Sequence, residues 1–181
     1  MQALDQFLAS VESRAYRLAV IATNSREDAL DIVQDAMFRL VKRYGDRSAD
    51  EWGPLFHRIV QSAIRDWYRR TQVRNRWRQF FGGRTSSEDQ EQGEDPLEAR
   101  FAVNEPEPGM QLANTRAMEA LDAVLHRLPL RQQQAFLLRK WEGLSVADTA
   151  TAMGCSDGSV KTHYSRAVKV LREHLQDHWL E

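Results

Sequence analysis

The sequence LSVADTATAMGCSDGSVKTHYSRAVKVL, from Leu144 to Leu171, decides the fold of the C-terminal part of this chain. Ser145 is a favoured helix N-cap and Asp148 completes a capping box with it, so a helix of about eight residues is predicted to end at Gly154. Ser156 then caps a longer helix that continues beyond the quoted stretch. A short helix, a turn containing glycine and a longer helix are typical of a DNA-binding helix-turn-helix.

The two faces of the longer helix fit this interpretation. An apolar stripe is formed by Val160, Tyr164, Ala167 and Leu171. The other face and its flanks carry short polar and cationic side chains, which can approach base edges and neutralise phosphates. These are Ser159, Lys161, Thr162, His163, Arg166, Lys169 and Arg172. An ordinary amphipathic helix with a solvated face has the same pattern, so the rest of the chain must decide.

Two more helices are predicted before this motif. Pro129 separates them, and Gly143 ends the second, which runs from Arg131 to Glu142. The candidate core residues are Met118, Leu121, Leu125 and Leu128 in the first helix and Phe136, Leu137 and Trp141 in the second. The C-terminal part is therefore predicted to be a small helical domain.

The N-terminal part predicts three helices that share one core. The second helix opens with a capping box at Ser25 and stops at Gly45, and the third starts near Pro54. The candidate core residues are Leu4, Phe7, Leu8, Val11 and Leu18, then Ala29, Ile32, Val33, Ala36, Leu40 and Val41, then Leu55, Ile59, Ala63 and Trp67. Neither part shows the alternation of β-strands, so the fold class is all-α.

Between the two parts the apolar periodicity disappears, and glycine, serine, proline and acidic residues take over. We therefore predict a domain over residues 1–80, a flexible acidic linker over 81–111 and a helix-turn-helix domain over 112–181. The formal net charge is only −1 because the acidic linker cancels a basic block before it, so the net charge does not argue against nucleic-acid binding.

Several classes of protein are disfavoured by the sequence. The chain starts without the features of a signal peptide and has no apolar run long enough to span a bilayer, so a cytoplasmic protein without direct membrane insertion is expected. The single cysteine, Cys155, cannot form an internal disulfide and is interpreted as a small apolar residue in a turn. We expect no metal site and no cofactor.

Arginines and aromatic residues alternate along the end of the third helix. The basic members are Arg65, Arg69, Arg70, Arg74, Arg76 and Arg78, and the aromatic ones are Trp67, Tyr68 and Trp77. Such a surface can follow a nucleic-acid backbone and stack on unpaired bases. A solvated helix end, with Trp67 in the core, explains the same pattern equally well.

A third candidate surface lies on the second helix, away from its apolar stripe. It consists of Asp31, Gln34, Asp35 and Phe38. An aromatic ring among carboxylates suggests a basic protein partner. The alternative is that Phe38 wraps over the edge of the core.

Taken in order, these segments resemble the small sigma factors of bacterial RNA polymerase, the extracytoplasmic-function (ECF) group, over essentially the whole chain. The segment from Asp31 to Phe38, DIVQDAMF, looks like the polymerase-binding helix of that family. LFHRIVQS from Leu55 and DWYRR from Asp66 look like its minus-10 segment. LPLR from Leu128, EGLS from Glu142 and GSVK from Gly158 look like its minus-35 domain.

The resemblance implies a non-catalytic subunit that joins core RNA polymerase, recognises minus-10 and minus-35 elements of promoter DNA and helps to melt it. By analogy, Asp31, Gln34, Asp35 and Phe38 meet the clamp helices of the largest polymerase subunit, and the C-terminal domain meets the flap region. The loop from Gly45 to Glu51 holds a flipped base. The minus-10 and melting residues are Arg58, Arg65, Trp67, Arg69, Arg70 and Arg74, and the minus-35 residues are Ser159, Lys161, Thr162, His163, Arg166 and Lys169. A cytoplasmic anti-sigma factor is also expected.

Two other functions are alternatives to this one. An operator-binding helix-turn-helix regulator, independent of polymerase, leaves the basic aromatic run and the Asp31 face unexplained. A DNA-processing enzyme such as a recombinase needs an acidic triad, a metal-ligand cluster or a nucleophile beside a base, and none is evident in the sequence. We therefore expect no enzymatic activity.

Overall fold

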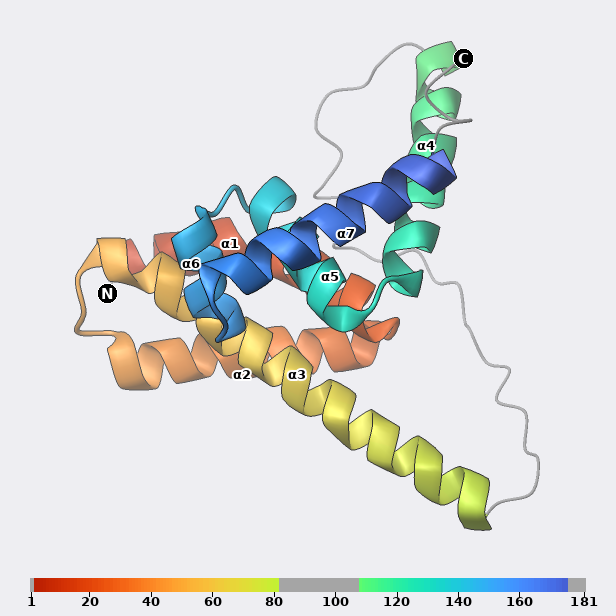
Figure 1. Ribbon diagram of the computed structural model, residues 1–181. Coiled ribbons are helices and arrows are strands. Elements are labelled where there is room, and N and C mark those ends of the chain that lie inside the picture. The colour runs from red at the N-terminus through yellow and green to blue at the C-terminus, as the bar shows by residue number, and fades with distance from the viewer. Residues whose placement is uncertain (1, 82–107, 176–181) are drawn as a thin grey trace.

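The computed structural model describes residues 2–81 and 108–175, and within them the side chains of residues 2–74 and 117–175. All regular elements in these ranges are helical, so the all-α prediction is confirmed. In Figure 1 the N-terminal helices are coloured red to yellow and the later helices green to blue. None of the helices described in these ranges is long and apolar enough to cross a membrane. Residues 82–107, most of the predicted linker, lie outside the described residues.

The first three helices are α1 (Gln2–Thr23), α2 (Arg26–Tyr44) and α3 (Ala49–Phe81), and they pack together. The predicted limits of α2 are confirmed, because the Asp28 amide donates to Ser25 Oγ at 3.2 Å and the Gly45 amide closes the last turn on the Val41 carbonyl. A second capping box was not predicted. Glu51 Oε2 accepts from the hydroxyl and the amide of Ser48, so α3 begins before Pro54 rather than at it.

The core of this three-helix unit differs in part from the prediction. Along α3 the most buried apolar side chains include Trp52, Phe56, Val60 and Ile64, which were not predicted. Leu55, Ile59 and Trp67 are only partly buried against the core, while Ala63 is buried as expected. Val41, predicted to be a core residue, is 47% exposed. It lies on the exposed side of α2, one turn after the exposed Phe38, so that prediction was wrong.

The later elements are α4 (Pro108–Arg127), α5 (Leu130–Phe136), the π-helical turn η2 (Leu137–Trp141), α6 (Val146–Met153) and α7 (Asp157–Leu175). Their core contains Leu125, Leu128, Leu137, Met153 and Val160, among others. Met118 was predicted to be buried but is 38% exposed, so that prediction was wrong.

The two sets of helices pack against each other. α6 lies on α3 and α4 contacts α1, as Figure 1 shows. Across this contact the Gln133 amide nitrogen donates to the Ile21 carbonyl at 3.2 Å, and Arg17 Nη2 lies 3.0 Å from Asp122 Oδ2. The structure is therefore a closed arrangement of two helical units.

Candidate nucleic-acid interface

Helices α6 and α7 form the helix-turn-helix that the sequence predicts. Ser145 Oγ accepts from the Asp148 amide at 3.0 Å, and Gly154 ends α6 in the left-handed conformation with φ of 63°. The Ser159 amide then donates to Ser156 Oγ at 3.2 Å, which caps the start of α7. The angle between the helices is thus fixed by backbone caps and by the buried Val160 and Ala167.

Most of the predicted contact residues on α7 face solvent. Lys161, Thr162, Arg166 and Lys169 are exposed. Ser159 is half-buried, and its hydroxyl lies 2.9 Å from that of Ser156, so it takes part in the cap.

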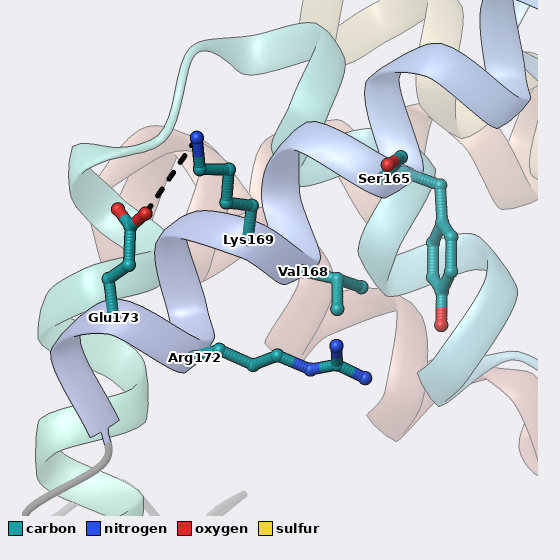
Figure 2. Close-up of a pocket in the computed structure, with 6 residues that line it drawn as sticks. Ser165, Val168, Lys169, Arg172 and Glu173 are labelled. Carbon is teal, nitrogen blue, oxygen red and sulfur yellow. Dashed lines mark ion pairs between the residues drawn. The ribbon is translucent and has the colours of Figure 1, made fainter.

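A shallow hollow runs along the exposed side of α7. Figure 2 shows Lys169 paired with Glu173 at 3.9 Å, with Arg172, Val168 and Ser165 on the same helix. Arg172, predicted on the flank of the polar face, is exposed here. Ser165 is also exposed, although the sequence did not predict it as part of this face. The polar surface of α7 is therefore wider than the sequence prediction.

His163 lies differently from its predicted neighbours. It is half-buried on the side of α7 that faces α3 and α5, and its Nδ1 is buried without a hydrogen-bond partner among the described residues. Burial lowers the pKa of its imidazole, and the positive charges of Arg131 and Arg166 lower it further. His163 is therefore a neutral ring in a cationic setting, rather than a member of the fully exposed face.

The arginines of α3 fall into two groups. Arg58, Arg69, Arg70 and Arg74 are exposed. Arg65 is partly buried, and its Nη1 donates to the carbonyl oxygens of two residues at the C-terminal end of α6, Met153 at 3.1 Å and Ala152 at 3.4 Å. Burial, followed by the charges of Arg131 and Arg69, lowers the pKa of Arg65. Trp67 is partly buried against the core and keeps one side accessible.

The acidic face of α2 is present as predicted. Phe38 is 63% exposed, with Lys42 Nζ 5.7 Å from its ring centre, so the alternative that Phe38 wraps over the core is wrong. Asp31 and Gln34 are exposed, and Asp35 forms an ion pair with Arg39 at 2.8 Å.

Two pockets bring the predicted residues together. The first, about 530 Å³, lies between α2 and α3 and contains Asp31 and Asp35 with Trp67, Arg70 and Arg74. The second, about 470 Å³, lies between α3, α5 and α7 and contains Arg65, Arg69, His163 and Arg166. Residues chosen for two different promoter elements thus share one pocket in this arrangement. Tyr68 and Arg131 line it as well, and only the LPLR motif pointed toward Arg131.

Comparisons with known proteins assign the two helical units to two family models. A family model described as Sigma-70 region 2 matches residues 4–74, and one described as Sigma-70, region 4 matches residues 118–171. ECF RNA polymerase sigma factor SigM of Mycobacterium tuberculosis (strain H37Rv) is 30% identical over 169 residues, which cover 91% of this chain and 73% of SigM. ECF RNA polymerase sigma factor SigX of Bacillus subtilis is 26% identical over 89% of this chain and 77% of SigX.

A solved structure has a similar fold. The sigma factor RpoE of Bartonella quintana, crystallised in complex with the anti-sigma factor NepR, superposes with a TM-score of 0.64. The match covers 97% of this chain and 98% of that one, at 21% sequence identity. At this identity the match supports the fold alone.

Proposed function

This chain belongs to the ECF sigma factors and directs promoter recognition by RNA polymerase, and we propose that three of its surfaces each make one of the contacts that this function needs. The α2 face binds core polymerase, the α3 arginines follow the melted minus-10 strand, and α7 enters the major groove at minus-35. Sigma factors are not enzymes, and the match to both sigma regions disfavours an operator-binding regulator that acts without polymerase.

The proposal for α2 rests on Phe38. A phenylalanine that is 63% exposed beside Asp31 and Gln34 leaves apolar area in water that a partner can bury. The carboxylates select a basic partner, for which we propose the clamp helices of the largest polymerase subunit. The Asp35–Arg39 ion pair keeps that carboxylate in place on the same face.

The proposal for α3 rests on four exposed arginines, Arg58, Arg69, Arg70 and Arg74, along one continuous helix. Cations at this spacing can follow a phosphate backbone, while the accessible side of Trp67 offers a ring to an unpaired base. The segment from Gly45 to Glu51, in which α3 begins at Ala49 behind the Ser48–Glu51 capping box, is our candidate for the site of the flipped base.

For α7 the supporting observation is that the exposed Thr162 and Arg166 lie one helical turn apart. Lys161 and Lys169 flank them on the same exposed side of the helix. Short polar groups and an arginine can read base edges, and the lysines can neutralise phosphates on either side. We propose in addition that the C-terminal domain meets the flap region of polymerase.

This division requires the closed arrangement to open. The two promoter elements are centred about 25 base pairs apart, which is about 85 Å of B-form DNA at about 3.4 Å per base pair. In the structure Arg65, Arg166 and His163 line one pocket of about 470 Å³. They cannot meet both elements of a straight duplex in this state, so we propose that binding to core polymerase separates the domains.

We also propose an anti-sigma partner for this chain, since the Bartonella quintana protein of similar fold is bound to one. The exposed, partly apolar face of α2 is the surface that such an inhibitor would have to cover to exclude polymerase.

The test is run-off transcription with purified core polymerase on a promoter library, with and without this chain. We expect initiation at a defined set of promoters that share two elements at fixed spacing. Initiation no higher than that of core polymerase alone would contradict the proposal. If the active promoters share a minus-35 element but tolerate any minus-10 sequence, the proposed role of α3 would be contradicted.

A further inference from the structure

The pocket between α3, α5 and α7 is lined by basic residues from both domains. We propose that it is a binding site for an oligophosphate group, free or carried by a nucleotide, which ties the two domains together. The α3 wall consists of Arg65, Tyr68 and Arg69, and the opposite wall of residues 129–132 with His163 and Arg166. Its volume of about 470 Å³ is within the range of small-molecule pockets, about 300–1,000 Å³.

The lining carries positive charge without compensation. Four of its nine residues are arginines and none is acidic. Within the residues that the structure describes, none of its four arginines forms an ion pair with a carboxylate. The exposed Asp66 is the one carboxylate whose charge favours the cationic form of Arg65.

The electrostatic effects of this crowding are visible in two side chains. The pKa of Arg65 is lowered by burial and then by Arg131 and Arg69. The pKa of His163 is lowered by burial and then by Arg131 and Arg166. A multiply charged anion in the pocket would relieve the repulsion among these groups, which a single monovalent ion would do only in part.

Two of the arginines are positioned by hydrogen bonds to the backbone of α6. Arg131 Nη1 donates to the Met153 carbonyl at 2.6 Å, and Arg65 Nη1 donates to the same oxygen at 3.1 Å. Each guanidinium keeps further N–H groups that have no partner among the described residues, and His163 Nδ1 is buried in the same condition. Donors fixed in this way lose little freedom when they bind an anion.

The donor set selects the class of ligand. Guanidinium groups bind phosphate oxygens with paired hydrogen bonds, and several guanidiniums match a chain of two or three phosphates better than an isolated carboxylate. Tyr68, 38% exposed at the edge of the pocket, offers a ring against which the base of a nucleotide can stack.

Occupation of the pocket has a consequence for promoter binding. The proposed promoter contacts in this pocket can reach DNA only when the two domains separate; they are Arg65, Arg69, His163 and Arg166. An anion bound between the two walls stabilises the closed arrangement. This consequence rests on the proposed function, whereas the binding site itself does not.

The experiment is isothermal titration of the full chain with tripolyphosphate and with ATP, at about 150 mM salt to screen weak surface attraction. The variant is Arg131→Gln, because Arg131 lines the pocket and has no proposed promoter contact. Its matched control is Arg127→Gln, an exposed arginine at the end of α4 that does not line the pocket. Circular dichroism checks that each variant is folded.

We expect one tripolyphosphate per chain, at least about tenfold weaker binding in Arg131→Gln, and less than about twofold change in Arg127→Gln. Tyr68→Ala should weaken ATP but not tripolyphosphate if the natural ligand is a nucleotide, and neither if it is a free oligophosphate. No binding in the millimolar range, or equal losses in both arginine variants, would overturn the site. Binding of single-stranded oligonucleotide but not of tripolyphosphate would overturn it too, and would assign the pocket to the DNA strand.

A transcription arm separates this inference from the proposed function. Tripolyphosphate, added at constant free Mg²⁺, should inhibit run-off transcription by wild-type chain more than by Arg131→Gln. Equal inhibition of the two would contradict the regulatory consequence. Promoter binding by core polymerase together with this chain, measured without nucleotides or oligophosphate, tests the proposed function alone, and its result does not depend on this pocket.

Discussion

Glu142 Oε2 lies 3.6 Å from His57 Nε2, across the contact between the two helical units. The carboxylate side chain is only 2% exposed, and Arg14 Nε lies 3.9 Å from the same oxygen. Arg14 and His57 come from α1 and α3, whereas Glu142 directly follows η2. Closure of the two units thus buries a carboxylate from one of them against two basic side chains of the other.

Burial dominates the titration of this cluster. It lowers the pKa of His57 to about 4, with help from the charge of Arg14, so the imidazole is neutral at pH 7. Burial raises the pKa of Glu142, while Arg14 lowers it and so opposes that shift. The charge of Glu142 is therefore balanced mainly by Arg14, and His57 lies beside the carboxylate as a neutral ring.

We predict that acid opens this contact through His57. In the unfolded chain His57 titrates near pH 6.5 and in the folded chain near pH 4, so between these values the unfolded chain binds more protons. The free energy of unfolding should fall by about 2 kcal/mol as the pH drops from about 6.5 to 4. The raised pKa of Glu142 acts in the opposite direction above its ordinary value, which reduces the net loss. Urea unfolding at several pH values measures this change in the free energy of unfolding.

The matched variants for this prediction are His57→Gln and His174→Gln, since His174 is exposed on α7. The pH dependence should flatten in the first and remain in the second. An unchanged pH dependence in His57→Gln would show that the acid response arises from other groups.

The ion pair between Arg17 and Asp122 predicts a second way to loosen the closed arrangement. The two atoms lie 3.0 Å apart, and Arg17 also lies 5.6 Å from the ring centre of Trp141. Because both side chains are partly exposed, Arg17→Ala should weaken domain contact by only about 1 kcal/mol. Small-angle scattering should show a larger radius of gyration. The reversed pair Arg17→Asp with Asp122→Arg should restore it, and failure to do so would assign the effect to Trp141.

The cap of α6 gives a prediction about stability. Ser145 Oγ accepts from the Asp148 amide and lies 2.5 Å from Asp148 Oδ2, so Ser145→Ala leaves that amide without its partner. We expect a loss of about 1 kcal/mol in thermal or urea unfolding. Ser165→Ala, on the exposed face of α7, should change stability by less than about 0.5 kcal/mol. Equal losses of stability in the two variants would mean that the hydrogen bonds of the Ser145 cap do not stabilise the domain.

The helix caps could be predicted from sequence because they depend on neighbours within four residues. Ser25, Ser145 and Gly154 all have the predicted roles. The start of α3 was missed because Pro54 was taken as its first turn. The Ser48–Glu51 box begins the helix earlier, and within the helix Pro54 removes only one backbone hydrogen bond.

The contact between the two units could not be predicted from the same patterns. One stripe of α3 contains Phe56, His57 and Gln61, and all three are buried. Because His57 and Gln61 are polar, apolar periodicity does not predict that this stripe is buried. The π-helical turn, closed by the Glu142 amide on the Leu137 carbonyl, adds a residue to the turn before Glu142. Which side chains then face α1 depends on tertiary packing, and the position of His163 depends on the same contact.

Charge reversal on α2 tests the polymerase-binding face. Asp31→Lys with Asp35→Lys should abolish binding to core polymerase, because a basic partner then meets repulsion instead of attraction. Asp5→Lys with Glu119→Lys makes the same charge change at exposed positions on α1 and α4 and should leave binding within about twofold. Co-migration with core polymerase on size exclusion measures both. Undiminished binding of the first pair would remove this face from the proposal.

Arg166 and Lys161 provide a matched test of how α7 meets DNA. Both are exposed, but Arg166 lies one turn after Thr162 on the polar face and Lys161 lies at its flank. In the assembled polymerase we expect Arg166→Ala to cost about 1–3 kcal/mol on a matching minus-35 element and little on a mismatched one, as a base contact requires. Lys161→Ala should weaken all sequences alike and reduce the slope of log affinity against log salt by about 1, as a phosphate contact requires. If Arg166→Ala also weakens every sequence equally, Arg166 contacts the backbone, and the specificity of α7 must come from the shorter side chains nearer its N-terminus.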